Sequence, residues 1–536
     1  MSSHYFIGID VGSASARAGI FDVNGELIAS AKHPIAVFHA DGHRVEQSSN
    51  DIWRAVCHCV RAVMQQSAIA PAQIGGIGYD ATCSLVVIDK QGTPLPVSVQ
   101  GDAERNIIMW MDHRAIAQAD AITATQYPVL RYVGERISPE MEVPKLLWLK
   151  QHNPETFQRA WQFFDLADYL TWRSTGDLTR SLCTVTCKWN YLAHENRWDD
   201  DYFHAVGLAE FPEEAYDRIG QHIAAPGTAC ANGLNAQAAK EMGLMPGTPV
   251  AIGMIDAHAG GIGTLGVEAS PEGQLAYVFG TSSCTMTSTR NAAFVPGVWG
   301  PYFSAMVPDF WLSEGGQSAA GAAIDRLLEL HPAAVEAQSL AQQAKLPLPV
   351  YLASLALQRI ENPSETVRLA TELHIVPEFN GNRAPNADPH ARALIYGLGM
   401  ERDVDSLISQ YIAGICSLGY GLRQIINAQR QNGIHTRSIV ISGGAGQHPL
   451  VRQLMADSCD CPVISTQSAE PVLLGSAMLA AVASGQFSSL IHAMRAMTKS
   501  EQTYQPSASQ QEVHRKRYQA FLLLQQTAKT VRENGQ

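Results

Sequence analysis

The chain opens on three short apolar runs separated by turn residues. These runs, at residues 4–10, 16–22 and 27–35, have the length and composition of β-strands. Small residues at 12–15 separate the first two runs, and an Asn-Gly turn at Asn24 precedes the third. The pattern therefore predicts a hairpin extended by a third strand.

An amphipathic helical pattern follows, after which strands and helices alternate. From Ser49, apolar residues recur on one face of a helix that Asn50 is placed to cap. Two further strands are predicted at 74–81 and 84–92. Helices are predicted at about 317–330, at 406–430 and, rich in small residues, at 471–485. Strands that alternate with amphipathic helices indicate an α/β fold.

The opening theme recurs in the second half of the chain. Residues 274–290 again read as strand, small-residue turn and strand. The turn at 280–283 parallels the turn at 12–15, about 270 residues earlier, as internal repeats do. We therefore expect two related domains, at residues 1–262 and 263–536.

The composition is that of a folded, acidic protein. The 536 residues include 38 Lys and Arg against 50 Asp and Glu, a net charge of −12, and 46% are hydrophobic. This hydrophobic share excludes a largely disordered chain, and the acidic balance argues against non-specific nucleic-acid binding. No secretory signal or membrane-spanning stretch is recognisable. We therefore expect a cytoplasmic protein with no nucleic-acid or membrane partner, whose ten cysteines stay reduced.

The turn after the first strand is a candidate phosphate-binding loop. Its strand ends at Asp10 and turns through Gly12, Ser13 and Ser15, which brings several backbone N–H groups to one point. Asp10 is a candidate ligand for Mg²⁺, which takes oxygen ligands, and Arg17 would add positive charge. A plain hairpin explains this loop equally well when it is taken alone.

A second loop of the same kind favours phosphate binding over a plain hairpin. Gly280, Thr281 and Ser282 offer the same small, hydroxyl-bearing turn in the other half of the chain. Two such loops, one per domain, would hold a polyphosphate from both sides. No Gly-Lys-Ser/Thr sequence is present, so the phosphate site is not a P-loop.

Asp256 is the candidate general base. It follows an apolar strand, and a carboxylate there would accept the proton of an attacking hydroxyl group. His258 is a rival base, and a helix cap is the structural alternative for Asp256. The glycines at 261–266 match a dinucleotide fingerprint, which would suit a dehydrogenase, but polar residues separate them from the strand. We expect close helix packing there instead.

Further candidates are polar or small residues beside predicted elements. Gly443, Gly444 and Ala445 follow a strand and would let a flat ligand such as adenine approach closely. Sugar hydroxyls need directional polar groups with an apolar flank. The residues of that kind are Asp80, Thr82, Cys83, Asp112, His113, Lys188, Glu314 and Gln317. By composition alone, each also fits a surface loop or a cap.

The chain resembles the FGGY carbohydrate kinases of the actin-like ATPase superfamily over about residues 4–490. GIDVGSASAR, FGTSS and ISGGAG are similar to the two phosphate motifs and the adenosine motif of the family. PKLLWLKQ, from Pro144, resembles its N-terminal signature, and GNRAPNADPHARALIYGL, from Gly381, its C-terminal one.

The resemblance implies two ribonuclease-H-like domains with a cleft between them, and ATP and Mg²⁺ as cofactors. It implies that Asp256 is the base and that Asp10 and Asp256 surround Mg²⁺. The loop residues Gly12, Ser13, Ser15 and Thr281 would contact phosphates, and Gly443, Gly444 and Ala445 would lie against adenosine. A homodimer is implied by the family only.

The resemblance also narrows the substrate. DATCSLVV, from Asp80, and LCTVTCKWNY, from Leu182, look like the kinases that act on D-ribulose, in which Lys188 and Glu314 match sugar contacts. We therefore predict ATP-dependent phosphorylation of a ketopentose, D-ribulose, to D-ribulose 5-phosphate. Xylulose, L-ribulose and ribitol stay open as substrates. A non-catalytic actin-like nucleotide-binding protein is the alternative of another class.

Overall fold

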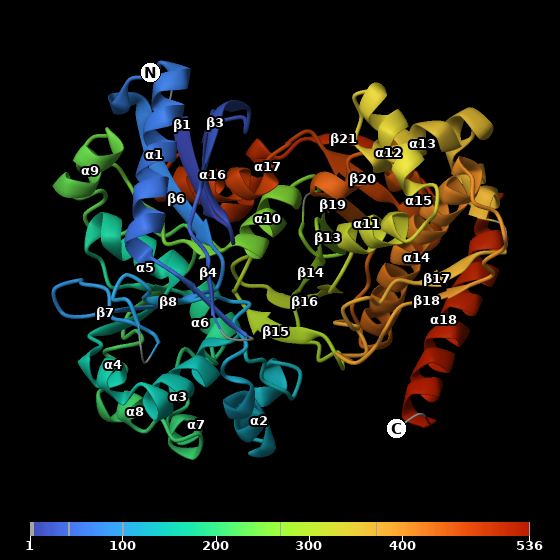
Figure 1. The fold of residues 1–536 in the computed structure, drawn as a ribbon. Coiled ribbons are helices and arrows are strands. Elements are labelled where there is room, and N and C mark those ends of the chain that lie inside the picture. Colours follow the sequence, from blue (N-terminus) through green and yellow to red (C-terminus); the bar gives the residue numbers. More distant parts are fainter. Residues whose placement is uncertain (1–4, 41–42, 99–100, 269, 371, 535–536) are drawn as a thin grey trace.

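The fold is built on two large mixed β-sheets, one in each half of the molecule (Figure 1). The computed structural model describes residues 5–40, 43–98, 101–268, 270–370 and 372–534. The N-terminal sheet lies on the left of Figure 1 and the C-terminal sheet on the right, with α10 (Asp256–Thr264) between them.

The N-terminal sheet has five strands in the order β12-β6-β1-β2-β3. The predicted meander is present, with β1 (Tyr5–Val11), β2 (Ser15–Phe21) and β3 (Leu27–Pro34) antiparallel. Strands β6 (Ile74–Ala81) and β12 (Met254–Ile255) continue the sheet parallel to β1.

The C-terminal sheet has seven strands in the order β15-β16-β14-β13-β19-β20-β21. Its central part repeats the first sheet, because β16, β14 and β13 are antiparallel while β19 and β20 run parallel to β13. The strands are β13 (Gln274–Phe279), β14 (Ser283–Thr289), β15 (Trp299–Phe303), β16 (Trp311–Gln317), β19 (Ser438–Ser442), β20 (Val463–Thr466) and β21 (Ser500–Tyr504). This duplication is the two-domain arrangement that the repeated loops predict.

The remaining elements surround these two sheets. A smaller five-stranded sheet has the order β4-β5-β8-β7-β9, and β10 pairs with β11 and β17 with β18. These strands are β4 (Phe38–Ala40), β5 (Arg44–Gln47), β7 (Leu85–Ile88), β8 (Ile107–Ile108), β9 (Gln162–Asp165), β10 (Arg180–Ser181), β11 (Ile223–Ala224), β17 (His374–Val376) and β18 (Leu394–Tyr396). N-terminal helices are α1 (Ser49–Ser67), α2 (Ile116–Ala124), α3 (Glu142–His152), α4 (Pro154–Arg159), α5 (Leu166–Thr175), α6 (Leu182–Lys188), α7 (Asp200–Ala205), α8 (Glu210–Glu213) and α9 (Ala236–Met242). C-terminal ones are α11 (Gly321–Glu329), α12 (Ala334–Gln343), α13 (Leu348–Arg359), α14 (Val404–Gln431), α15 (Pro449–Cys459), α17 (Leu490–Met497) and α18 (Gln511–Asn534).

Two details of the predicted helices were wrong. The cap of α1 is Ser48, whose hydroxyl accepts the N–H of Asp51, rather than Asn50. The helix expected from Gln317 begins at Gly321, because Gln317 still pairs with Ser283 in the sheet. Among the helices of the described ranges, none combines the length and the apolar character that crossing a membrane requires.

Helices α10 (Asp256–Thr264) and α16 (Pro471–Ala483) connect the two halves. Although α16 comes late in the chain, it packs on β1 and β6 of the N-terminal sheet, and α10 packs on α16 and against β13 and β19 (Figure 1). The expected boundary after residue 262 falls inside α10, so that boundary stays a prediction.

Glycines allow these two helices to touch. A Cβ atom at Gly263 would overlap the carbonyl oxygen of Pro471, and one at Gly475 would overlap that of Ala259. The glycines at 261–266 therefore lie mostly within a helix and serve its packing, as expected. A dinucleotide fingerprint needs its glycines at the turn between strand and helix. These glycines therefore give no support to the dehydrogenase alternative.

Replacing Gly263 with alanine is expected to lower the free energy of unfolding by about 1–3 kcal/mol, the usual cost of forcing extra atoms into a packed interior. The backbone of Pro471 cannot swing aside as a side chain does. Urea unfolding followed by circular dichroism measures the loss. Gly260→Ala is the control, because its methyl group would meet only side-chain carbons of Val472 and Val278, at 3.3 and 3.6 Å. Equal stabilities would contradict the packing role.

Candidate active site

Three aspartates lie at the carboxyl ends of three adjacent parallel strands. Asp10 on β1 is in register with Asp80 on β6, and Asp256 follows β12 directly. Burial, followed by the charge of Asp10, raises the pKa of Asp80 well above its ordinary range. The same two causes raise the pKa of Asp256 to about 6. The edge of the N-terminal sheet therefore concentrates negative charge.

Two of these three aspartates, Asp10 and Asp80, accept hydrogen bonds from other side chains. The Nε of Arg17 donates to Asp10 at 2.6 Å, and another nitrogen of Arg17 donates to Glu470 at 2.6 Å. The hydroxyl of Ser476 donates to Asp80 at 2.5 Å. The predicted contacts of Arg17 with phosphate and of Asp80 with sugar stay predictions, since both side chains already have protein partners.

Asp256 is placed differently from the other two. It is the first residue of α10, is half-buried, and accepts the N–H of Ala257 at 2.7 Å through one carboxylate oxygen. The hydrogen bond resembles a cap, which was the structural alternative. It also orients the carboxylate, and a base with a pKa just below neutral is deprotonated yet able to accept a proton.

The pKa of Asp256 predicts the acid side of the pH profile. The group must be deprotonated to act as a base, so kcat/KM for the sugar should fall about tenfold per pH unit below pH 6 and level off above it. Initial rates at low sugar and saturating ATP measure this. A profile that stays flat to about pH 5, with the protein still folded, would contradict a base of raised pKa.

The two candidate phosphate loops are both short turns between antiparallel strands, the first with four residues between paired positions and the second with three. In the first, the N–H of Gly12 donates to the carbonyl of Ser15 at 3.0 Å, and Ser13 accepts the indole N–H of Trp110 at 3.0 Å. In the second, the N–H of Gly280 donates to the carbonyl of Ser282 at 3.0 Å. Each turn joins the first two strands of its sheet, which is the placement that the sequence predicts.

The candidate adenosine segment lies beside the second loop. Gly443 follows β19 with a φ of 94°, a left-handed conformation that favours glycine, and its backbone lies against that of Phe279. A Cβ atom at Gly444 would meet nothing within 4 Å, so its backbone is open to a ligand. One at Gly321 would lie 2.7 Å from the carbonyl oxygen of Gly280 and 3.5 Å from the Cβ of Ala445.

Charged side chains from three elements lie near Asp256, namely Lys188 of α6, His258 of α10 itself and, beside both, Glu314 of β16. The Nζ of Lys188, at the end of α6, lies 4.8 Å from the ring centre of Trp299, and the Nε2 of His258 lies 3.2 Å from a carboxylate oxygen of Glu314. Burial alone would raise the pKa of Glu314, but the charges of Lys188 and His258 hold it at about 2. Within the described part of the chain, the Lys188 ammonium has no hydrogen bond or ion pair.

Two predicted sugar-binding residues, Asp112 and His113, already contact other side chains of the N-terminal half. Asp112 is fully buried and accepts from the N–H of Val45 and from the guanidinium of Arg114, both at 2.7 Å. His113 lies 3.6 Å from Glu140 and is half-exposed. Asp112 therefore serves the interior, and the predicted sugar contacts of both residues stay predictions.

Of the other predicted sugar contacts, Thr82 and Cys83 directly follow β6, whereas Gln317 is the last residue of β16. The hydroxyl of Thr82 pairs with that of Ser84 at 3.0 Å. Cys83 lies near Lys188, whose charge opposes the rise in the Cys83 pKa that burial causes. The Gln317 amide accepts from Tyr277 at 2.8 Å and donates to the carbonyl of Leu418 at 3.0 Å. Gln317, at the end of β16, therefore lies beside the second loop, and its contact with sugar stays a prediction.

Several residues near Lys188 and Glu314 were not among the predicted site residues. Trp299 and Tyr302 come from β15, which belongs to no motif, and only its aromatic content in WGPYF was a signal. Arg383 lies in the C-terminal signature segment, and its charge is among those that lower the pKa of Glu314. The C-terminal signature includes Arg383, but the sequence did not show that this residue lies close to Glu314 in the fold.

The residues present suit the cofactors that the family implies. Asp10 and Asp256 offer carboxylate oxygens, the ligands that Mg²⁺ prefers, and a cation there would relieve the repulsion that raises the pKa of Asp256. The open backbone at Gly444 and the exposed Thr281 suit the two ends of a nucleotide.

The duplicated sheets have the two-domain arrangement of the actin-like ATPase fold. Among solved structures, the xylulose kinase from Rhodospirillum rubrum has the same fold, with a TM-score of 0.80 at 19% identity, over 98% of this chain and 99% of that one. Models of the N- and C-terminal domains of the FGGY family of carbohydrate kinases match residues 5–263 and 275–484. The chain belongs to the FGGY family of carbohydrate kinases, and it is a sugar phosphotransferase.

Curated relatives span nearly the whole chain. It is 43% identical over 531 residues to the FGGY carbohydrate kinase domain-containing protein of Homo sapiens, covering 97% of this chain and 96% of the relative. It is 35% identical over 520 residues to a D-ribulokinase of Saccharomyces cerevisiae, covering 90% of this chain and 72% of the relative.

Proposed function

We propose that this kinase transfers the γ-phosphoryl group of ATP to the terminal hydroxyl of a ketopentose, D-ribulose, giving D-ribulose 5-phosphate and ADP. The observation that carries the proposal is the half-buried Asp256, with its pKa of about 6, beside the polar group of Lys188 and Glu314. The D-ribulokinase of Saccharomyces cerevisiae, a relative of 35% identity, supports the choice of sugar.

Asp256 accepts the proton of the terminal hydroxyl as the oxygen attacks. Its hydrogen bond from Ala257 holds the carboxylate in one orientation, and the accepted proton resides on the free oxygen. Phosphoryl transfer depends mostly on positioning and on charge stabilisation. The backbone amides of the loops at 12–15 and 280–282 supply both to the phosphate chain.

Lys188 and Glu314 position the sugar. The Lys188 ammonium is a donor without a hydrogen-bond partner in the described ranges, and Glu314 is an ionised acceptor. The ring of Trp299 provides an apolar flank beside Lys188. A chain of hydroxyls needs this combination of directional polar groups and an apolar surface.

Asp10 and Asp256 would hold Mg²⁺, which would supply positive charge to offset that of the phosphates. FGGY kinases use ATP as the phosphate donor, and Gly443, Gly444 and Ala445 would lie against its adenosine.

A panel of sugars tests the proposal. ADP release is coupled to NADH oxidation and followed with D-ribulose, L-ribulose, D- and L-xylulose and ribitol, each with ATP and Mg²⁺. The expected result is the highest kcat/KM for D-ribulose. A higher value for another sugar would reassign the substrate. ATP binding without sugar-dependent ADP release in any sample would favour the non-catalytic alternative.

A further inference from the structure

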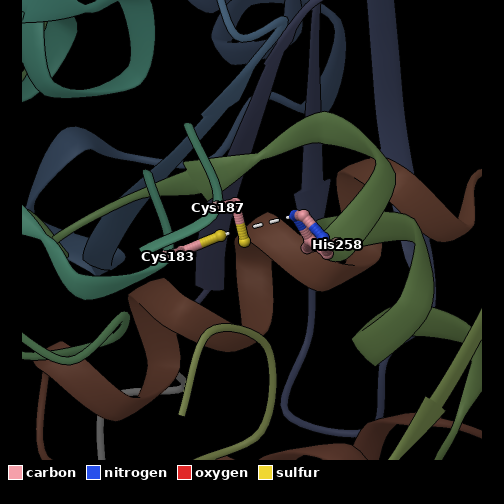
Figure 2. A group of neighbouring side chains, drawn as sticks. All are labelled: Cys183, Cys187 and His258. Carbon is pink, nitrogen blue, oxygen red and sulfur yellow. Dashed lines mark hydrogen bonds between the residues drawn. The ribbon is translucent and has the colours of Figure 1, made fainter. Parts of the chain in front are cut away.

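Sulfur and imidazole ligands gather in the interior between α6 and α10 (Figure 2). Cys183 and Cys187 extend from successive turns of α6 toward His258 of α10, and all three are buried. The Sγ of Cys183 lies 3.4 Å from the Nδ1 of His258, and the three donor atoms lie within 4.8 Å of one another. Within the described ranges, no other three Cys, His, Asp or Glu side chains meet so closely.

The spacing of these donor atoms fits one metal ion. Residues four apart on a helix share a face, which brings both thiols of α6 to the same side. With zinc bonds of about 2.3 Å to sulfur and 2.0–2.1 Å to nitrogen, a tetrahedral site separates its donors by about 3.5–3.8 Å. The separation between Cys183 and His258 is already close to this value.

The second nitrogen of His258 supports the same conclusion. Its Nε2 lies 3.2 Å from the carboxylate of Glu314, which keeps a proton on Nε2, so that Nδ1 would present its lone pair to a metal once its own proton is displaced. Histidines that bind metals usually donate their other N–H to a carboxylate in this way. Glu314 would therefore orient the ligand without touching the metal.

Charge balance also suits a divalent ion. Two thiolates and a neutral imidazole carry two negative charges, which one divalent cation cancels. Lys188 and Glu314 beside the cluster already offset each other. A metal there adds no unpaired charge to the interior, where an unpaired charge is costly. Thiolate ligands select zinc over magnesium, so this site is distinct from the magnesium position at Asp10 and Asp256.

We propose that Cys183, Cys187 and His258 bind one Zn²⁺, which ties α6 to α10, with water in the fourth position. The consequence is positional. Lys188 follows Cys187 directly and Asp256 lies two residues before His258, so the metal would fix the sugar-positioning lysine relative to the base. The proposal does not depend on which sugar the kinase uses.

Metal analysis of the full-length protein, purified without chelators, tests the site. About one zinc per chain is expected by plasma mass spectrometry. Cys187→Ser and His258→Gln should each lose most of it. Cys230→Ser should keep it, because Cys230 is also a buried free cysteine but lies outside the cluster. Zinc retained in both cluster variants, or absent from wild type under these conditions, would count against the proposal.

Cobalt separates loss of the site from loss of the fold. Metal-depleted wild-type protein, shown to be folded by circular dichroism, is titrated with Co²⁺. Thiolate ligation should produce sulfur-to-cobalt charge-transfer absorption that saturates at about one equivalent and is displaced by Zn²⁺. A folded protein that gives no such absorption, and no zinc in the metal analysis, would overturn the proposal.

Discussion

Replacing Asp256 with asparagine is expected to lower kcat by at least about 10²–10⁴-fold, the contribution of a positioned general base. Asparagine fills the same space and can still accept the N–H of Ala257. It cannot accept the proton of the sugar hydroxyl, and it weakens the oxygen donor set for Mg²⁺. Affinity for ATP should stay close to the wild-type value, because the candidate nucleotide contacts lie in other segments. Coupled kinetics and ATP titration measure the two effects.

A matched aspartate provides the control. Asp177 is also partly buried and accepts backbone N–H groups, from Thr179 at 2.9 Å and from Ala231 at 3.0 Å. Asp177→Asn should turn over normally if it folds. Near-normal turnover in Asp256→Asn would exclude Asp256 as the base, and His258 would become the next candidate.

Local pattern was enough to predict the frame of the site. Strand alternation and turn chemistry over a few residues gave β1, β2, β13 and β14, and the loops between them at 12–15 and 280–282. Asp256 was found because it directly follows a strand. Each of these features depends on residues that are close together along the chain, so one sequence is enough to reveal it.

Contacts between distant segments were not predicted. The sequence singled out α16 as a small-residue helix, but its position against β1, more than 450 residues earlier, follows only from tertiary packing. Arg17 was expected to face phosphate, yet it pairs with Asp10 and with Glu470 just before α16. In the same way, Cys183 and His258 meet only because α6 and α10 pack together.

Replacing Lys188 with methionine is expected to lower kcat/KM for the sugar by about 10–100-fold, since a hydrogen bond from a charged donor contributes about 1.5–3 kcal/mol. Methionine keeps an unbranched side chain of similar length and removes the charge. The KM for ATP should change little. The charge of Lys188 also lowers the pKa of Asp256, so the acid limb of the pH profile should move to higher pH.

The shift of the acid limb distinguishes a role of Lys188 in positioning the sugar from a role in stability alone. A variant that is merely unstable would lose activity toward sugar and ATP alike and would leave the acid limb unmoved. Kinetics at fixed ATP and at fixed sugar, together with a pH series, distinguish these outcomes. Equal changes in both KM values, with no shift of the acid limb, would remove Lys188 from the sugar site. The expected asymmetry arises because Lys188 lies beside Glu314 and Trp299, whereas the candidate adenosine segment lies next to Gly280.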